Sequence, residues 1–198
     1  MVFLKYKRRG KVDNQLVNLN SQLRAIADQD KVQMIGSTVA TLLAHGQFCV
    51  CQWAGDSRIY RVRSDVMELL TQDHALVAEL VEKGILSPAE ALGHPQSNLV
   101  TRALGASDQL YLDAEIYDLA HGDYFILCSD GLNKALSEQE ILQVVRNETV
   151  ETMSDVLVET ALHRGARDNV TVICVEVFRN TMDSISSERA CVEGPASD

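Results

Sequence analysis

Residues 124–132 have the sequence Tyr124-Phe125-Ile126-Leu127-Cys128-Ser129-Asp130-Gly131-Leu132. A short apolar run of this kind is typical of a buried strand, and here it ends at an aspartate followed by a glycine. A second apolar run, from Asn169 to Phe178, follows another aspartate, Asp168. A carboxylate fixed at the end of a strand is a rigid ligand for a hard cation such as Mg²⁺ or Mn²⁺. The two motifs therefore predict a sheet with acidic side chains at its strand ends.

The composition indicates one globular domain. The chain has 198 residues, of which 46% are hydrophobic and 23% charged, and this is enough for a substantial core. Its net charge of -10 disfavours a binding surface for nucleic acid or anionic membrane, because both select clustered Lys and Arg. The sequence shows no signal peptide and no apolar run long enough to span a membrane. We therefore expect a cytoplasmic protein with reduced cysteines.

Hydrophobic spacing predicts a mixture of helices and strands. The predicted helices cover residues 12–29, 74–83, 88–93, 137–145 and 152–164. The predicted strands cover residues 38–44, 47–54, 59–63, 66–71, 110–118, 123–128 and 169–178. Because the connections between residues 38 and 71 are short, we expect the first four strands to form one antiparallel meander.

The same pattern divides the chain into three parts. Residues 1–11 hold the one basic run and are interpreted as a solvated N-terminal arm, although such a run can also contact an acidic partner. Residues 12–178 form the domain, and no linker divides them. Residues 179–198 are polar and lack periodicity, which predicts a disordered tail.

Three turns bear an aspartate next to a strand, namely Asp56, Asp130 and Asp168. A compact sheet can bring these carboxylates together, and a divalent cation then removes their mutual repulsion. Alternatively, each aspartate only accepts hydrogen bonds from backbone N–H groups in its own turn. Spacing alone leaves both interpretations open.

Several short motifs follow one another along the chain, and their order is more informative than any one of them alone. They are Gly36-Ser37-Thr38-Val39, Ala54-Gly55-Asp56-Ser57-Arg58-Ile59-Tyr60, Leu70-Thr71-Gln72-Asp73-His74, His94-Pro95, Leu99-Val100-Thr101-Arg102-Ala103-Leu104-Gly105, Leu127-Cys128-Ser129-Asp130-Gly131-Leu132 and Asp168-Asn169-Val170-Thr171. This ordered set resembles the metal-dependent protein phosphatases (PPM, the protein phosphatase 2C type) and covers residues 36–177. The resemblance implies an α+β fold in which two packed antiparallel β-sheets are flanked by helices, as a four-layer α-β-β-α sandwich.

The resemblance also implies an activity. Members of this family are protein serine/threonine phosphatases that hydrolyse phosphomonoesters on phosphoproteins with a metal-activated water. The expected cofactor is Mn²⁺ or Mg²⁺, and the expected partners are phosphorylated proteins and a cognate bacterial Ser/Thr kinase. The segment Glu82-Lys83-Gly84-Ile85-Leu86-Ser87-Pro88 is similar to bacterial members, including those attached to type VI secretion systems.

The family's roles transfer to individual positions of this sequence. By resemblance, Asp130 and Asp168 are ligands of a binuclear centre, and Asp56 shares a third metal with Asp130. The expected supports of the metal-binding turns are Gly131, which permits a tight turn, Asn169, which orients Asp168, and Gly55 and Arg58, which shape and brace the turn around Asp56.

One part of the family pattern does not occur in this sequence. The family's Asp-Gly-Met-Gly-Gly-type turn, whose aspartate bridges both core metals, and its general-acid histidine are not found, and the one Asp-Gly pair is Asp130-Gly131. We therefore assign no catalytic residue, and we expect an incomplete core metal pair and an N-terminally incomplete domain. The alternatives are a catalytically impaired remnant that binds phosphoproteins or a kinase, and a truncated gene product.

Other polar side chains have less specific interpretations. His74, His94 and His121 are candidates for a replacement acid, but a structural hydrogen-bonding role is favoured for His74. Arg58, Arg61 and Arg63 are basic enough to attract phosphate, but Arg61 and Arg63 share one face of their predicted strand, which favours a solvated edge.

Overall fold

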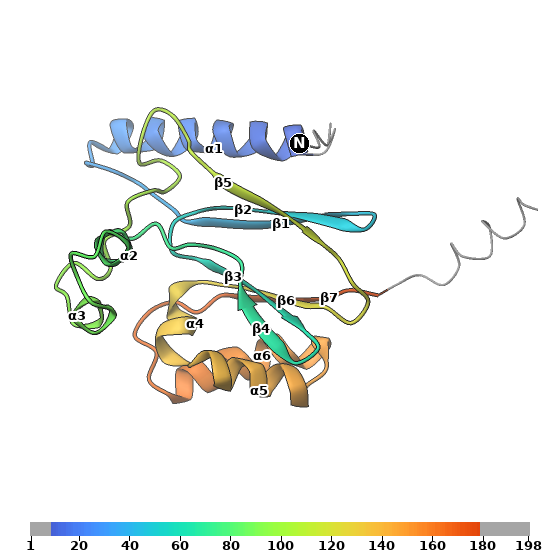
Figure 1. Ribbon diagram of the computed structural model, residues 1–198. Coiled ribbons are helices and arrows are strands. Elements are labelled where there is room, and N and C mark those ends of the chain that lie inside the picture. Colours follow the sequence, from blue (N-terminus) through green and yellow to red (C-terminus); the bar gives the residue numbers. More distant parts are fainter. Residues whose placement is uncertain (1–8, 179–198) are drawn as a thin grey trace, which may run out of the picture.

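The computed structural model describes residues 9–178, which form two packed antiparallel sheets with helices on both outer faces (Figure 1). The helices are α1 (Arg9–Asp30), α2 (Leu76–Glu82), α3 (Pro88–Leu92), α4 (Asp130–Ala135), α5 (Glu138–Asn147) and α6 (Val150–His163). The strands are β1 (Val39–His45), β2 (Phe48–Ala54), β3 (Arg58–Arg63), β4 (Val66–Leu69), β5 (Asp113–Asp118), β6 (Tyr124–Cys128) and β7 (Val172–Glu176). The predicted α-β-β-α layering is confirmed.

The structure describes part of the predicted N-terminal arm and none of the predicted tail. Helix α1 begins at Arg9, so the last residues of the predicted basic arm are helical. Residues 1–8 and the predicted tail, 179–198, lie outside the described residues. Between these limits, no helix is long and apolar enough to cross a membrane.

The first four strands do not form one meander, so that prediction is wrong. Strands β1, β2 and β5 form one sheet in the order β1-β2-β5, and the other sheet has the order β4-β3-β6-β7. The chain crosses between the sheets after β2, at Gly55, whose φ of 115° is rarely adopted by residues with a side chain. This crossing places Asp56 at the junction of the two sheets.

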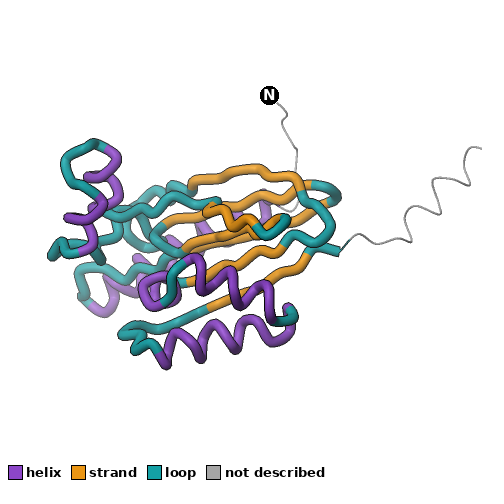
Figure 2. The backbone as a smooth tube through the Cα atoms, turned by 60° about the horizontal axis from the view of Figure 1, so that its bottom comes forward, coloured by secondary structure: helices purple, strands orange, loops and turns teal. Residues whose placement is uncertain are grey.

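Strand β6 of the four-stranded sheet is buried on both faces, which explains its continuous apolar run. On β6, Ile126 and Cys128 face the helices, whereas Phe125 and Leu127 face the other sheet. Figure 2 shows helices lying across the outer face of the strands. These helices fix α4, and with it Asp130, relative to the end of β6.

Two helices begin at the serine residues where the sequence predicts their N-caps. Ser87 and Ser137 each form a capping box with the glutamate three residues later, at the starts of α3 and α5. Helix α4 was not predicted, because it begins at Asp130 directly after a strand and has only 6 residues. Asp130 is therefore the first residue of a helix and does not lie in an open turn.

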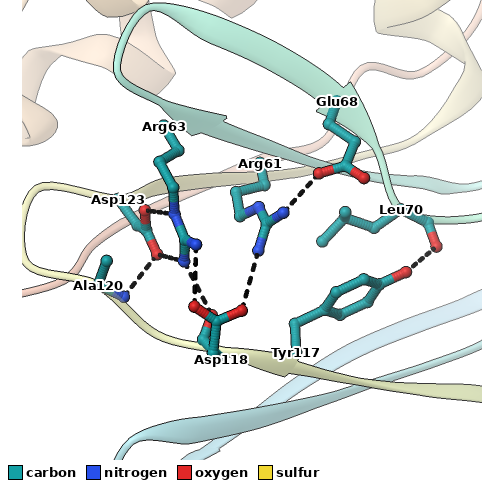
Figure 3. Close-up of polar contacts among 8 residues, drawn as sticks. All are labelled: Arg61, Arg63, Glu68, Leu70, Tyr117, Asp118, Ala120 and Asp123. Atoms are coloured by element: carbon teal, nitrogen blue, oxygen red, sulfur yellow. Dashed lines mark hydrogen bonds and ion pairs between the residues drawn. The ribbon is translucent and has the colours of Figure 1, made fainter.

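Arg61 and Arg63 do not lie on a solvated edge, contrary to the prediction. Strand β3 lies between β4 and β6, and both arginines point from it toward the three-stranded sheet (Figure 3). Arg63 donates from Nε and Nη2 to the carboxylate of Asp123, at 2.7 Å each, and from Nη1 to Asp118 on β5 at 2.9 Å. Arg61 donates to Glu68 at 2.6 Å. This polar network ties the two sheets together at one end of the sandwich.

Candidate metal centre

Two of the three predicted metal ligands lie in one groove. Asp56 stands at the crossing between the sheets, and Asp130 begins α4. Both carboxylates line a groove of about 810 Å³, whose other wall is formed by α2 and α3. Burial and the neighbouring charge of Asp130 raise the pKa of Asp56. The two carboxylates are therefore close enough to repel each other, which is the electrostatic setting that a bound cation relieves.

A lysine that was not predicted as a site residue contacts this acidic pair. The Nζ atom of Lys134 donates to Oδ2 of Asp130 at 2.6 Å and to Oδ1 of Asn98 at 2.8 Å. Lys134 lies one turn after Asp130 on α4, a spacing that brings opposite charges together on a helix. It was overlooked because α4 itself was not predicted. Lys134 places a positive charge between the acidic groove and the loop after α3.

The third aspartate, Asp168, lies on the other side of the start of α4. It lines a second pocket, of about 420 Å³, together with Gly131 and Lys134. Its Oδ1 atom accepts a hydrogen bond from the backbone N–H of Asn169 at 2.8 Å. The described contacts thus orient Asp168 through the Asn169 backbone. Lys134, in the last turn of α4, lines both this pocket and the acidic groove.

Gly131 allows the close approach of α4 to the Asp168 segment. A Cβ atom at Gly131 would lie 2.4 Å from the carbonyl oxygen of Asn169, which is far inside van der Waals contact. The hydroxyl of Ser129 donates to the same carbonyl at 3.1 Å. The absence of a side chain at position 131 therefore lets the segment that follows Asp168 lie directly against the start of α4.

We expect Gly131→Ala to destabilise the protein by about 1–3 kcal/mol, because the helix start must move away from a backbone atom. Urea unfolding followed by circular dichroism measures this change. Gly93→Ala is the matched control, since a Cβ atom there meets nothing within 4 Å and its φ is -100°. Equal stability of the two variants would contradict the close-packing role of Gly131.

Arg58, which was predicted to brace the turn around Asp56, forms an ion pair with Asp73. Its guanidinium donates to both oxygens of Asp73, at 2.8 to 3.2 Å, and its Nη1 atom donates to the hydroxyl of Tyr60 at 3.0 Å. Asp73 directly precedes His74, whose backbone N–H donates to the Gly55 carbonyl at 2.9 Å. The structure thus places Arg58 beside the Asp56 turn while its ion pair is with Asp73.

The donor chemistry of Asp56 and Asp130 fits a hard divalent cation, because both supply only oxygen atoms and face one groove. Because Gly131 has no side chain, the Asp168 segment packs against the same helix start. Within residues 9–178, however, no three acidic, histidine or cysteine side chains are close enough to form a ligand set. The residues present therefore fit a cation at the Asp56–Asp130 pair, and the described part of the chain does not assemble a complete binuclear centre.

A family model, sequence relatives and solved structures all match this chain and point to one family. Residues 99–170 match the family Protein phosphatase 2C. The serine/threonine phosphatase stp of Listeria innocua is 36% identical over 169 residues, which are 85% of this chain and 66% of that protein. This chain therefore spans slightly less than two thirds of the length of that relative.

Solved structures show the same relationship. "PppA, a key regulatory component of T6SS in Pseudomonas aeruginosa" aligns with a TM-score of 0.78 at 38% identity, covering 85% of this chain and 70% of that one. The catalytic domain of the serine threonine protein phosphatase PstP, solved with 2 manganese ions, aligns with a TM-score of 0.73 at 30% identity, covering 81% and 67%. The layered fold is thus that of the metal-dependent phosphatases. The chain belongs to the PPM family, the protein phosphatase 2C type.

Proposed function

We propose that this chain is a metal-dependent protein serine/threonine phosphatase that hydrolyses phosphomonoesters on phosphorylated proteins. The observation that carries the proposal is the position of Asp56 and Asp130 together in one groove, at the strand ends where the family resemblance predicts metal ligands. Asp168, against the same helix start, is the third proposed ligand.

The groove supplies distinct surfaces for the two ends of a phosphorylated residue. Asp56, Asp130 and Asp168 would hold Mn²⁺ or Mg²⁺, which lowers the pKa of a coordinated water and neutralises phosphoryl charge when bound. The Lys134 ammonium, hydrogen-bonded to Asp130, would attract the phosphate group. The apolar wall of the groove would take the carbon part of the substrate; its residues are Val77, Ala78, Val81, Pro88 and Ala91.

The proposed substrates and partners are phosphorylated proteins and the cognate Ser/Thr kinase that phosphorylates them, in the cytoplasm. The similarity to PppA, which is described as a regulatory component of a type VI secretion system, supports a kinase associated with such a system. Residues 12–178 are proposed as the phosphatase domain.

The test is hydrolysis of a phosphothreonine peptide by this purified chain, with Mn²⁺ or with excess chelator. We expect phosphate release that requires the metal. A folded protein that releases no phosphate above the chelator control would overturn the proposal. Circular dichroism of the same preparation establishes that it is folded.

A second candidate function is binding of phosphoproteins without hydrolysis. It is favoured by the absence of a three-residue ligand set within residues 9–178 and of an Asp-Gly-Met-Gly-Gly run anywhere in the sequence. Fluorescence anisotropy with the same phosphopeptide separates the two functions, because binding without phosphate release supports this second candidate.

A further inference from the structure

His74 is a buried histidine that contacts the turn bearing Asp56. Its residue is 6% exposed, and its ring stacks on the indole of Trp53 with centroids 6.2 Å apart. The backbone N–H of Gly55 donates to Nδ1 of His74 at 3.2 Å, and the N–H of His74 donates back to the Gly55 carbonyl at 2.9 Å. Both backbone polar groups of Gly55, the residue before Asp56, are thus hydrogen-bonded to one residue.

These hydrogen bonds define the proton arrangement of the ring. Because Nδ1 accepts from the Gly55 amide, it bears no proton, and the neutral imidazole must bear its proton on Nε2. The Nε2 atom lies 3.0 Å from Oδ2 of Asp113, which is a hydrogen-bond acceptor. Nη1 of Arg102, a donor, is farther from Nε2, at 3.4 Å, and bonds to Asp113 instead. Asp113 is fixed in turn by Arg102, which donates to its other oxygen at 2.8 Å. A carboxylate at the start of β5 therefore selects the tautomer that can accept from Gly55.

His74 also connects this turn to the base of the α2–α3 segment. The backbone N–H of Thr101 donates to the His74 carbonyl at 2.8 Å, and that of Leu76 donates to the Leu99 carbonyl at 2.9 Å. These bonds close the loop that bears the apolar wall of the groove. One residue thus contacts the Gly55 turn through its ring and its N–H, and the segment that follows α3 through its carbonyl.

In this turn, position 55 accepts only glycine. Its φ is 115°, and a Cβ atom there would lie 2.3 Å from Cγ2 of Thr38. The direction of the Asp56 side chain therefore depends on the orientation of the Gly55 amide, whose one described acceptor is the His74 ring.

We propose that His74 is a positioning residue for Asp56: its neutral ring, protonated on Nε2 and oriented by Asp113, holds the Gly55 amide so that Asp56 faces Asp130. This role rests on the proposed function, in which Asp56 is a metal ligand. Outer-shell partners of metal ligands commonly change metal affinity by about 10–100-fold when they are removed.

The test uses two variants that differ in which ring nitrogen they replace. In His74→Asn the amide oxygen can take the place of Nδ1, whereas in His74→Gln the side-chain amide reaches the place of Nε2. At constant pH, Mn²⁺ affinity is measured by electron paramagnetic resonance of free Mn²⁺, which requires no catalytic activity. We expect His74→Gln to weaken affinity by at least about 10-fold and His74→Asn to stay within about 3-fold of the wild type.

A second measurement does not depend on metal at all. Hydrogen exchange of the Gly55 amide, followed by nuclear magnetic resonance, should show protection in the wild type and in His74→Asn, and its loss in His74→Gln. The ring nitrogens of His74 should give one protonated and one unprotonated ¹⁵N signal. If both variants protect Gly55 equally, or both fail to, the positioning role is overturned. If the wild type shows the expected protection but binds no Mn²⁺, the turn-positioning role stands and the proposed metal-dependent function fails.

Discussion

Replacing Asp130 by asparagine is expected to lower metal-dependent phosphopeptide hydrolysis by at least about 100-fold. Removing an outer-shell partner of a metal ligand already costs up to about 100-fold, and a direct ligand should cost at least as much. Asp130 shares the groove with Asp56 and influences its pKa, so the loss of its charge removes half of the acidic pair. Initial rates at a fixed Mn²⁺ concentration measure the effect.

Glu82→Gln is the matched control for this variant. Glu82 lines the same groove, and its replacement by glutamine removes the same single charge. However, Glu82 lies on α2, on the wall opposite the acidic pair. We expect its rate to stay within about 3-fold of the wild type, as a weakly coupled surface charge should. Wild-type hydrolysis by Asp130→Asn would show that Asp130 is not a ligand.

The largest expected effect on stability comes from Asp123→Ala. The Asp123 side chain is buried and accepts two hydrogen bonds from Arg63 and one from the N–H of Ala120 at 2.8 Å (Figure 3). Removing one partner of a buried ion pair typically costs about 3–5 kcal/mol. Because Arg63 is partly exposed and keeps its bond to Asp118, we expect a loss near the lower end of this range. Urea unfolding of the wild type and the variant measures the difference in free energy.

Asp118→Ala serves as the control, because the Asp118 side chain is 65% exposed and also pairs with Arg63. Its expected cost is below about 1 kcal/mol, as for other exposed ion pairs. A loss of stability as large as that of Asp123→Ala would mean that burial does not decide the effect.

The effect of Asp123→Ala should also depend on pH. Burial alone would raise the pKa of Asp123, but the hydrogen bonds from Arg63 and Ala120 outweigh it and lower the pKa below the ordinary value of 3.8. The stabilisation is therefore complete above about pH 3.8 and is lost as pH falls through the lowered pKa of the folded state. The free-energy difference between wild type and variant should accordingly shrink only in that acidic range.

Much of the layered fold could be predicted because its elements have distinct local signals. The serine capping boxes of α3 and α5 and the apolar runs of β2 and β6 each specify one element. The partition of strands between two sheets could not be predicted from these signals. It depends on the crossing at Gly55, and a glycine in a short turn is equally compatible with a hairpin and with a change of sheet.

The site was predictable only in part, for a similar reason. The aspartates follow from motifs, whereas their supports depend on tertiary contacts between distant segments. Arg58 pairs with Asp73, and His74 reaches the Gly55 amide, across 15 and 19 positions of sequence respectively. The partly buried position of Arg61 and Arg63 between the sheets follows from the place of β3 inside its sheet, which alternation within a single strand does not reveal.

The most direct test of this account is Mn²⁺ binding to the purified chain, measured by electron paramagnetic resonance beside Asp56→Asn. Two carboxylates facing one groove predict a bound ion whose affinity falls by at least about 10-fold when one of them loses its charge. A chain that binds no Mn²⁺, or binds it equally well in the variant, would contradict the assignment of this groove as a metal centre.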